Sequence, residues 1–215
     1  SWNLIEDCTD LGLICAAGEC VDTTVECAEA INAKSYIGCE YWGVDMDNYT
    51  ATLPYGIVVS NMESSTVHVD VEQRDSLGWN VVESADIPSE TAEVFLLGNT
   101  TTNGSFHLPY KAFRVTSDAP VVAYQFNPYS GLTSDDSDIC TNDGTLLIPR
   151  SALDLHYYAL VYPPNVSEAM IVIAGTEDDT TVQVTASANI NAGTSVPAIS
   201  AGSTETFVIQ AADVI

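Results

Sequence analysis

Hydrophobic and polar residues alternate along much of this chain with the two-residue period of β-strands, and one such pattern occurs twice. In residues 170–187, MIVIAGTEDDTTVQVTAS, an apolar β-branched run is followed by a polar turn and then by strict alternation from Thr181. This pattern predicts a β-hairpin. Residues 56–73, GIVVSNMESSTVHVDVEQ, carry the same pattern 114 to 115 positions earlier.

Two further blocks extend the match. Residues 41–44 resemble residues 157–160, and residues 91–96 resemble residues 204–209. Four blocks in one order predict a duplicated strand scaffold whose loops differ in length. Chance similarity between β-strands is the alternative.

The strand pattern divides into two groups. The first group comprises residues 37–44, 55–60, 66–72, 79–83, 91–97, 112–116 and 121–127, with turns at 75–78 and 117–120 among others. The second comprises residues 145–149, 156–162, 170–175, 180–187 and 204–211, with a short helical turn at 151–155. Short strands with frequent turns favour an antiparallel β-sandwich of immunoglobulin size, and a closed barrel is the competing architecture.

The predicted fold class is therefore all-β, with two tandem antiparallel β-sandwich modules preceded by a small disulfide-rich segment. The predicted boundaries are a Cys-rich cap at 1–35 with one helical turn at 28–33, a first module at 36–129, an acidic linker at 130–144 and a second module at 145–215. The second module lacks counterparts of the first module's last two strands. Either the polypeptide continues beyond it, or another subunit supplies a strand.

Charge narrows the possible partners. Thirty acidic residues face five basic ones, for a formal net charge of −25. Such a field repels phosphate backbones and anionic lipids, so we expect neither nucleic acid nor an acidic membrane as a partner. No apolar run is long enough to span a bilayer. Self-association must overcome the same repulsion through salt screening, divalent cations or apolar contact.

The cysteines indicate an oxidising compartment. An even number of cysteines, most of them in one cluster, without histidines at zinc-ligand spacing favours disulfides over metal. The six cysteines are Cys8, Cys15, Cys20, Cys27, Cys39 and Cys140. We expect two bridges among the first four and a third from Cys39 to Cys140. Four sequons in predicted turns are candidate glycosylation sites: Asn48, Asn99, Asn103 and Asn165.

The sequence shows no catalytic constellation. None of His68, His107 and His156 accompanies a nucleophile motif, and there is no phosphate-binding loop or H-E-x-x-H. We therefore expect no enzymatic activity and no cofactor. The one candidate ligand is Ca²⁺, because carboxylates gather on two predicted loops. The linker carries Asp135, Asp136, Asp138 and Asp143, and the turn of the second hairpin carries Glu177, Asp178 and Asp179. Neither loop has EF-hand spacing, so plain solvated loops are the alternative.

Three stretches together resemble a known family. They are APVVAYQFNP at 119–128, TLLIPRSALDLHYYAL at 145–160 and MIVIAGTEDDTTVQV at 170–184. In this order they resemble the N-terminal domain family of the IgG Fc-binding mucus protein and above all its bacterial secreted relatives, over residues 38–215. The resemblance implies an extracellular β-rich module without an active site. Family members usually continue to a further Pro-Val strand, which this chain lacks, and no matched residue here is known to contact an antibody.

These observations predict an extracellular or cell-surface protein with a structural or adhesive role, a subunit of a fibre assembled by strand addition between protomers. Its expected partners are other copies of itself and a protein or glycan ligand. The aromatic residues of the repeated strands, such as Tyr157 and Tyr158, support the alternative of a glycan-binding module in a larger secreted protein. Packing of these aromatics in the core or in an interface is the competing interpretation.

Overall fold

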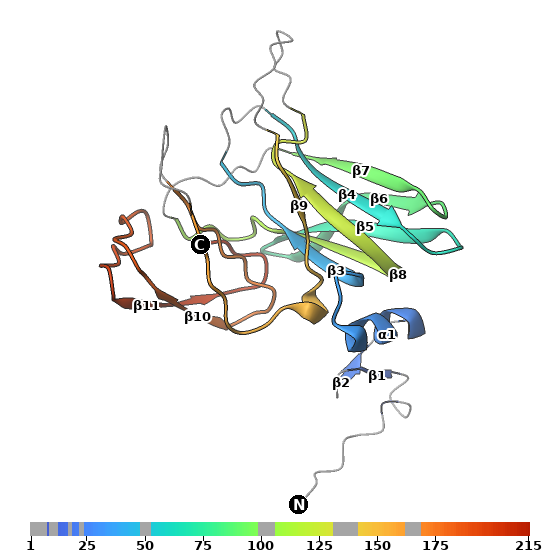
Figure 1. The fold of residues 1–215 in the computed structure, drawn as a ribbon, viewed down its shortest axis with the longest axis horizontal. Helices are drawn as coiled ribbons and strands as arrows, with labels where there is room; N and C mark the ends of the chain where they lie inside the picture. Colours follow the sequence, from blue (N-terminus) through green and yellow to red (C-terminus); the bar gives the residue numbers. More distant parts are fainter. Residues whose placement is uncertain are drawn as a thin grey trace, which may run out of the picture.

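The computed structural model describes residues 8, 13–16, 19–21, 24–47, 53–98, 106–130, 142–161 and 169–215. The fold is mostly β, as predicted, with one α-helix among the described residues (Figure 1). The strands are β1 (Ile14–Ala16), β2 (Glu19–Val21), β3 (Gly38–Gly43), β4 (Tyr55–Asn61), β5 (Val67–Asp75), β6 (Gly78–Ile87), β7 (Ala92–Leu97), β8 (Phe113–Phe126), β9 (Gly144–Leu146), β10 (Thr180–Thr185) and β11 (Thr204–Ile209). The helices are α1 (Val25–Ala33) and the 3-10 turn η2 (Arg150–Ala152).

The N-terminal segment is stapled by disulfides, as expected, but its pairing differs from the prediction. Cys8 is bonded to Cys20 in β2, and Cys27 in α1 is bonded to Cys39 in β3. The predicted Cys39–Cys140 bridge is therefore wrong, because α1 lies against β3 and brings Cys27 within reach of Cys39. Cys15 is exposed with a free thiol.

Helix α1 is longer than the single turn expected at 28–33. The side chain of Thr24 caps its first turn by accepting a hydrogen bond from the backbone N–H of Cys27, at 3.2 Å. The helix ends at Lys34, which adopts the left-handed conformation with φ of 47°. Cys27, Ala28 and Ala30 form its buried face.

Strands β3 to β9 form one β-sandwich in which β8 belongs to both layers. The first half of β8 pairs with β5 and β3, and its second half pairs with β4 and β9. The main path of pairing is β6-β5-β8-β4-β7, and β3 and β9 each pair with β8 off this path. The predicted turn at 117–120 is therefore not a turn but the place where one continuous strand passes from one layer to the other.

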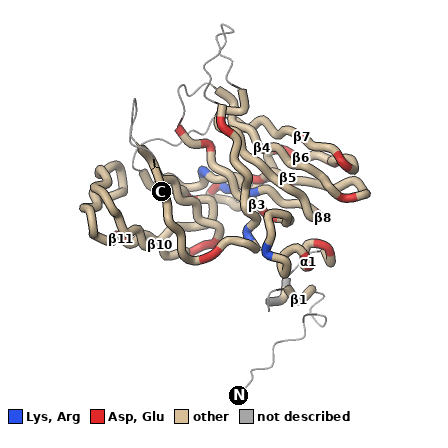
Figure 2. The backbone as a smooth tube through the Cα atoms, viewed as in Figure 1, with Lys and Arg blue, Asp and Glu red and all other residues tan. Residues whose placement is uncertain are grey.

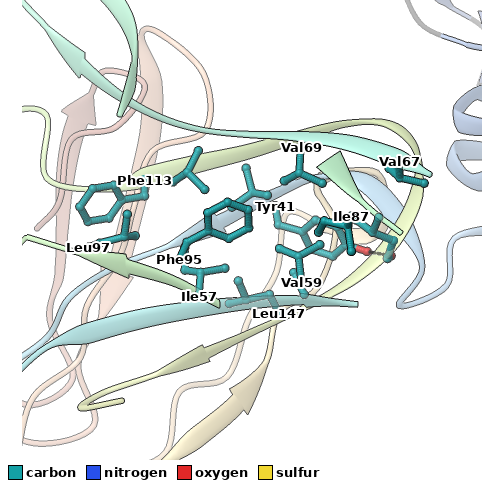
Figure 3. Close-up of a cluster of buried hydrophobic side chains, with 14 of the residues drawn as sticks. Tyr41, Ile57, Val59, Val67, Val69, Ile87, Phe95, Leu97, Phe113 and Leu147 are labelled. Atoms are coloured by element: carbon teal, nitrogen blue, oxygen red, sulfur yellow. Dashed lines mark hydrogen bonds between the residues drawn. The ribbon is translucent and has the colours of Figure 1, made fainter. Parts of the chain in front are cut away.

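The core lies between the two layers and consists of apolar side chains that alternate along the strands (Figure 3). Its fully buried members include Tyr41, Tyr55, Ile57, Val59, Val67, Val69, Val71, Val115 and Val121. The hydroxyl of buried Tyr55 donates to Oε1 of Gln125 at 2.9 Å, so its polar end has a partner inside the core. Burial raises the pKa of Tyr55 well above its usual value.

Leu147 is also part of this core, although the sequence places it in the second module. It follows β9, and its backbone N–H donates to the carbonyl of Ala123 in β8 at 2.9 Å. The start of the predicted second module thus completes the first sandwich. The described residues therefore do not form two tandem sandwiches.

Several strand predictions for the second half are wrong. Residues 156–161 and 170–175 form no strand, apart from an isolated bridge between Ala174 and Val214. The predicted hairpin at 56–73 is also wrong, because β4 and β5 each pair with β8 and not with one another. Alternation along a strand reports which face is buried, but it does not report which neighbour supplies the hydrogen bonds.

By sequence, residues 204–209 resemble residues 91–96, which include most of β7. In the structure, however, their pairing corresponds to that of β6. β11 forms a hairpin with β10, just as β6 does with β5. The position of β7 is taken instead by residues 213–215: the N–H of Gly175 donates to the carbonyl of Asp213, as that of Asn61 donates to the carbonyl of Thr91, both at 2.9 Å. The two halves therefore share part of a pairing scheme.

Candidate functional site

The most conspicuous surface feature is an exposed apolar segment, residues 153–161, that directly follows η2. All nine residues of LDLHYYALV are exposed, and the side chains of Leu155, Tyr158 and Leu160 are 89%, 99% and 95% accessible. Residues 156–161 make no backbone hydrogen bond to the described part of the chain. An exposed run of apolar side chains is typical of a surface that binds a partner.

The beginning of this segment is fixed by Arg150. Its guanidinium forms an ion pair with Glu177 and lies 3.7 Å, from Nε to Oε1, from Glu40 of β3. Arg150 thus joins the segment to both the sandwich and the acidic turn before β10. Residues 153–161 therefore follow a residue that is held by ion pairs on two sides.

The acidic turn, Glu177 to Asp179, was a predicted calcium loop. Its three carboxylates instead face three separate partners: Glu177 pairs with Arg150, Asp178 with Arg74, and Asp179 accepts from the Gln210 side chain at 3.1 Å. Among the described residues no group of three His, Cys, Asp or Glu could hold a metal ion. The turn therefore docks this part of the chain onto the sandwich.

Arg74 of β5 is the centre of this docking. Its guanidinium donates to both carboxylate oxygens of Asp178 and to the carbonyl of Ala211. The hydrogen bonds from Arg74 lower the pKa of Asp178, and the same bonds raise the pKa of Arg74. Bidentate pairing of this kind fixes orientation as well as distance.

A cationic and aromatic cluster lies beside this pair. Arg114 of β8 stacks over Trp79 at 3.8 Å from the ring centroid, and it forms a bidentate pair with Glu72 at 2.8 and 3.0 Å. Trp42 meets Trp79 edge to face at a centroid separation of 5.6 Å. Figure 2 shows that much of the basic charge gathers near the contact between the sandwich and the acidic turn, while acidic residues are spread over the rest of the chain. Trp42, which lies in one of the repeated blocks, is therefore packed against another ring of the same chain.

The C-terminal residues also pack against the sandwich, next to the acidic turn. Val214 and Ala212 pack with Val44 and Ala112 in a second apolar cluster. The carboxylate of buried Asp213 accepts from Nε2 of His107 at 3.0 Å and from the N–H of Gln210 at 3.1 Å. A buried carboxylate requires such partners, so His107 has a structural role.

His68 belongs to the arrangement that comes closest to a catalytic one. Its Nδ1 lies 2.7 Å from Asp86, and its Nε2 lies 3.4 Å from the hydroxyl of Ser84. Nε2 is also 3.3 Å from Asp70, and the hydrogen bond to Asp86 is the main cause of a raised pKa for His68. Both carboxylates favour the protonated form of this exposed imidazole.

One hollow in the described part of the chain is small. The hollow lined by Gln73, Val82, Glu83, Leu96, Leu97, Gly98 and Phe113 has a volume of about 190 Å³. Sites for drug-sized ligands usually enclose about 300–1,000 Å³. This hollow therefore offers little to a small molecule.

Several predicted sites lie outside the described residues. These are the linker carboxylates Asp135, Asp136 and Asp138, the cysteine Cys140, and the sequons Asn48, Asn99, Asn103 and Asn165. Calcium binding in the linker and glycosylation stay predictions. The sequence did not single out Arg74, Arg150 or residues 153–155 as functional, although the scarcity of basic residues could have drawn attention to the two arginines.

Residues 143–215 match the family model described as IgGFc binding protein. This confirms the resemblance for that segment, which is about a third of the chain and contains both the exposed segment and the acidic turn. No curated protein and no solved structure matches the chain.

The disulfides and the family match together point to an extracellular protein of a binding type. In the part of the chain that the structure describes, no helix is long and apolar enough to cross a membrane.

Proposed function

We propose that this chain is an extracellular structural and adhesive protein, without catalytic activity, that binds other polypeptides along residues 153–161. Copies of it join through the same segment into a fibre when salt screens their charge. The observation that carries the proposal is the exposure of Leu155, Tyr158 and Leu160 on a segment anchored at Arg150. The matched segment and the disulfides support the extracellular location.

The absence of catalysis rests on the geometry around His68. Ser84, His68 and Asp86 lie on the exposed face of the β5–β6 pair, and His68 is shared with Asp70. Because this group is exposed on a sheet face and no nucleophile motif accompanies it, we expect it to catalyse no reaction.

The test for binding compares two variants of the full chain. Tyr158→Ser with Leu160→Asp removes the exposed apolar surface, and Leu77→Asp changes a side chain that is 94% exposed in the β5–β6 turn as a matched control. Immobilised IgG Fc is the first protein probe, because the family description names it. We expect the double variant to lose binding to the protein partner while the control retains it. Equal binding by both variants would refute a role for this segment.

The fibre is tested separately by electron microscopy and sedimentation at low salt and at about 0.5 M NaCl, where the Debye length falls to a few ångströms. We expect association only at high salt, and only without the double substitution. If the chain stays monomeric under both conditions, fibre assembly is refuted, whereas the binding role is not.

A glycan-binding module is the second candidate. Adjacent Tyr157 and Tyr158 are 66% and 99% exposed, and exposed tyrosine rings can stack on sugar rings. A glycan array in which the Tyr158→Ser chain loses a signal seen with the native chain would favour it.

A further inference from the structure

One outer face of the sandwich is formed by the side chains of β9, β8, β4 and β7 that point away from the core. In these strands Ile57, Phe95 and Ala123 are buried between the layers, and the residues next to them point outward because side chains alternate along a strand. The strand registers place eleven outward residues in three cross-strand rows, which we call the neutral face. The rows are Gly144, Phe126, Gly56 and Leu96; Leu146, Tyr124, Val58 and Val94; and Val122, Ser60 and Ala92.

The neutral face differs in charge from the outer face of the other layer. None of its eleven residues is charged, and only Ser60 and Tyr124 have a polar side chain. On the other layer the outward residues of β5 include His68, Asp70 and Glu72, which lie between the buried valines of that strand. In a chain with a net charge of −25, a face without charge suits an uncharged ligand.

Three aromatic rings lie on or beside the neutral face. Tyr124, in its middle row, is 37% exposed. Two glycines leave room for the other rings, because a Cβ on Gly56 would lie 3.0 Å from Tyr129 and one on Gly144 would lie 2.7 Å from Phe126. The rings of Phe126 and Tyr129 meet edge to face with their centroids 6.0 Å apart. Both rings therefore rest close to the backbone of the sheet and add aromatic surface next to Tyr124.

The neutral face is too small for a stable interface between two copies of the chain. Rows about 7 Å apart on strands about 4.8 Å apart cover on the order of 300 Å². A stable complex buries about 800 Å² on each partner. Two chains with a net charge of −25 also repel one another. The size and the charge therefore favour a small uncharged ligand.

We infer that the neutral face binds an uncharged oligosaccharide, with one sugar ring stacked on Tyr124. A pyranose has an apolar C–H face and hydroxyl groups at its edge, which match an aromatic ring bordered by the hydroxyls of Tyr124, Tyr129 and Ser60. An extended peptide fits this face poorly. The backbone groups of β8 and β4 are bonded within the sheet, so the backbone of a peptide would lose water without gaining partners. Acidic sugars are repelled by the net charge.

This surface shares no residue with the segment 153–161, so the inference does not depend on the proposed function. The probes are uncharged cello-, manno- and chito-oligosaccharides, with an oligogalacturonate as the acidic comparison. Their binding to the full 215-residue chain is measured by isothermal titration calorimetry.

Two variants change the neutral face in different ways. Tyr124→Thr removes the central ring and keeps a residue type that favours strands. Leu146→Glu keeps every ring and puts a charge beside Tyr124, its cross-strand neighbour. Tyr158→Ser is the matched control, because it removes a tyrosine that is 99% exposed outside this face. Circular dichroism melts check the fold of each variant, and either face variant that folds is sufficient for the test.

At least one uncharged oligosaccharide is expected to bind the native chain, and the oligogalacturonate is not. Tyr124→Thr and Leu146→Glu should each weaken binding about tenfold or more, which corresponds to about 1.4 kcal/mol. Tyr158→Ser should bind as the native chain does. In the native chain, the NMR resonances of Val58, Tyr124 and Leu146 should shift when the sugar is added.

The inference is overturned if no uncharged probe binds, if the oligogalacturonate binds equally well, or if both face variants bind undiminished. A native dimer that Leu146→Glu dissociates would identify the neutral face as a contact between copies and would also overturn it. Loss of sugar binding in Tyr158→Ser alone would place the glycan site on residues 153–161. Failure of the segment 153–161 to bind a protein partner would refute the proposed function and leave these expectations unchanged.

Discussion

Arg74 and Asp178 lie 104 positions apart and form a bidentate ion pair that joins β5 of the sandwich to the acidic turn before β10. The Arg74 side chain is 22% exposed and also lies 5.9 Å from the Trp79 ring centroid and 5.7 Å from that of Tyr110. One guanidinium therefore contacts the sandwich, the turn and the C-terminal segment. It orients the segment that matches the family.

This pair predicts an acid-sensitive junction. Because Arg74 lowers the pKa of Asp178 below its usual value of 3.8, the pair stabilises the folded state fully above pH 3.8. The contribution is lost as the pH falls below 3.8 through the lowered pKa. We expect the Asp178→Asn chain to melt at a lower temperature than the native chain at pH 6, and the two melting curves to converge near pH 2.

Circular dichroism melts from pH 2 to 6 measure this difference. Asp154→Asn is the control, because Asp154 is exposed and pairs with no arginine in the described chain. A difference between native and Asp178→Asn chains that persists undiminished at pH 2 would show that the carboxylate acts through something other than its charge.

Leu147 and Leu146 are neighbours with opposite environments. Leu147 is 7% exposed in the sandwich core, and Leu146 is 37% exposed in β9. Truncation of a buried leucine to alanine removes apolar contact and leaves a cavity, at a cost of about 2–5 kcal/mol. We expect this loss for Leu147→Ala and about 0.5 kcal/mol or less for Leu146→Ala, as measured by urea unfolding. Equal effects would mean that β9 does not complete the first sandwich.

The sequence predicted strands such as β5 well because they present one buried face. Alternation in β5, where Val67, Val69 and Val71 are buried, identifies the strand without knowledge of its neighbours. It could not show that β8 is one strand shared by two layers. The polar residues at 117–118 resemble a turn, and the continuity of β8 depends on pairing with four other strands.

The surroundings of Gly175 show how closely residues 210–215 pack against the chain that leads into the acidic turn. A Cβ at this position would overlap the backbone carbonyl of Gln210, whereas a Cβ at Gly98 would meet nothing within 4 Å. We expect Gly175→Ala to lower the free energy of unfolding by about 1–3 kcal/mol, the usual cost of overpacking, and Gly98→Ala to have little effect. Urea unfolding of both variants measures this. A native-like Gly175→Ala chain would mean that residues 210–215 are not held against the turn.

The candidate site was harder to predict than the fold for an electrostatic reason. Carboxylates at 177–179 suggested calcium because loop oxygens are its usual ligands. In the structure each has a different partner, and Arg74 and Arg150 are far from the turn in sequence. The apolar segment after η2 was assigned to a strand because its composition is that of a strand, and sequence alone does not show that the described chain provides it with no partner.

The contacts of His68 predict a raised pKa, which can be measured. The hydrogen bond to Asp86 at 2.7 Å raises the pKa of His68 above its usual value of 6.5, and Asp70 adds a smaller effect. NMR titration of the native chain should give a value above 6.5, and Asp86→Asn should lower it more than Asp70→Asn. Since the folded pKa is raised, the interaction stabilises the fold below pH 6.5 and is lost as the pH rises through the raised pKa. A pKa at or below 6.5 would contradict the observed pairing.

The disulfides can be tested by digestion with trypsin without reduction. Lys34 lies between Cys27 and Cys39, and Arg74, Arg114 and Arg150 provide the other useful cleavage sites. A Cys27–Cys39 bond joins the fragments 1–34 and 35–74, whereas a Cys39–Cys140 bond joins the fragments 35–74 and 115–150. We expect mass spectrometry to find the first linked pair.

Alkylation of the native chain before digestion provides the control. Cys15 is exposed with a free thiol, so the fragment 1–34 should carry one alkyl group while it remains linked to 35–74. A fragment 1–34 without a label would mean that Cys15 is not free, and linkage of 35–74 to 115–150 would mean that α1 does not hold Cys27 against β3. In that case the disulfide staple of the N-terminal segment would have to be assigned again.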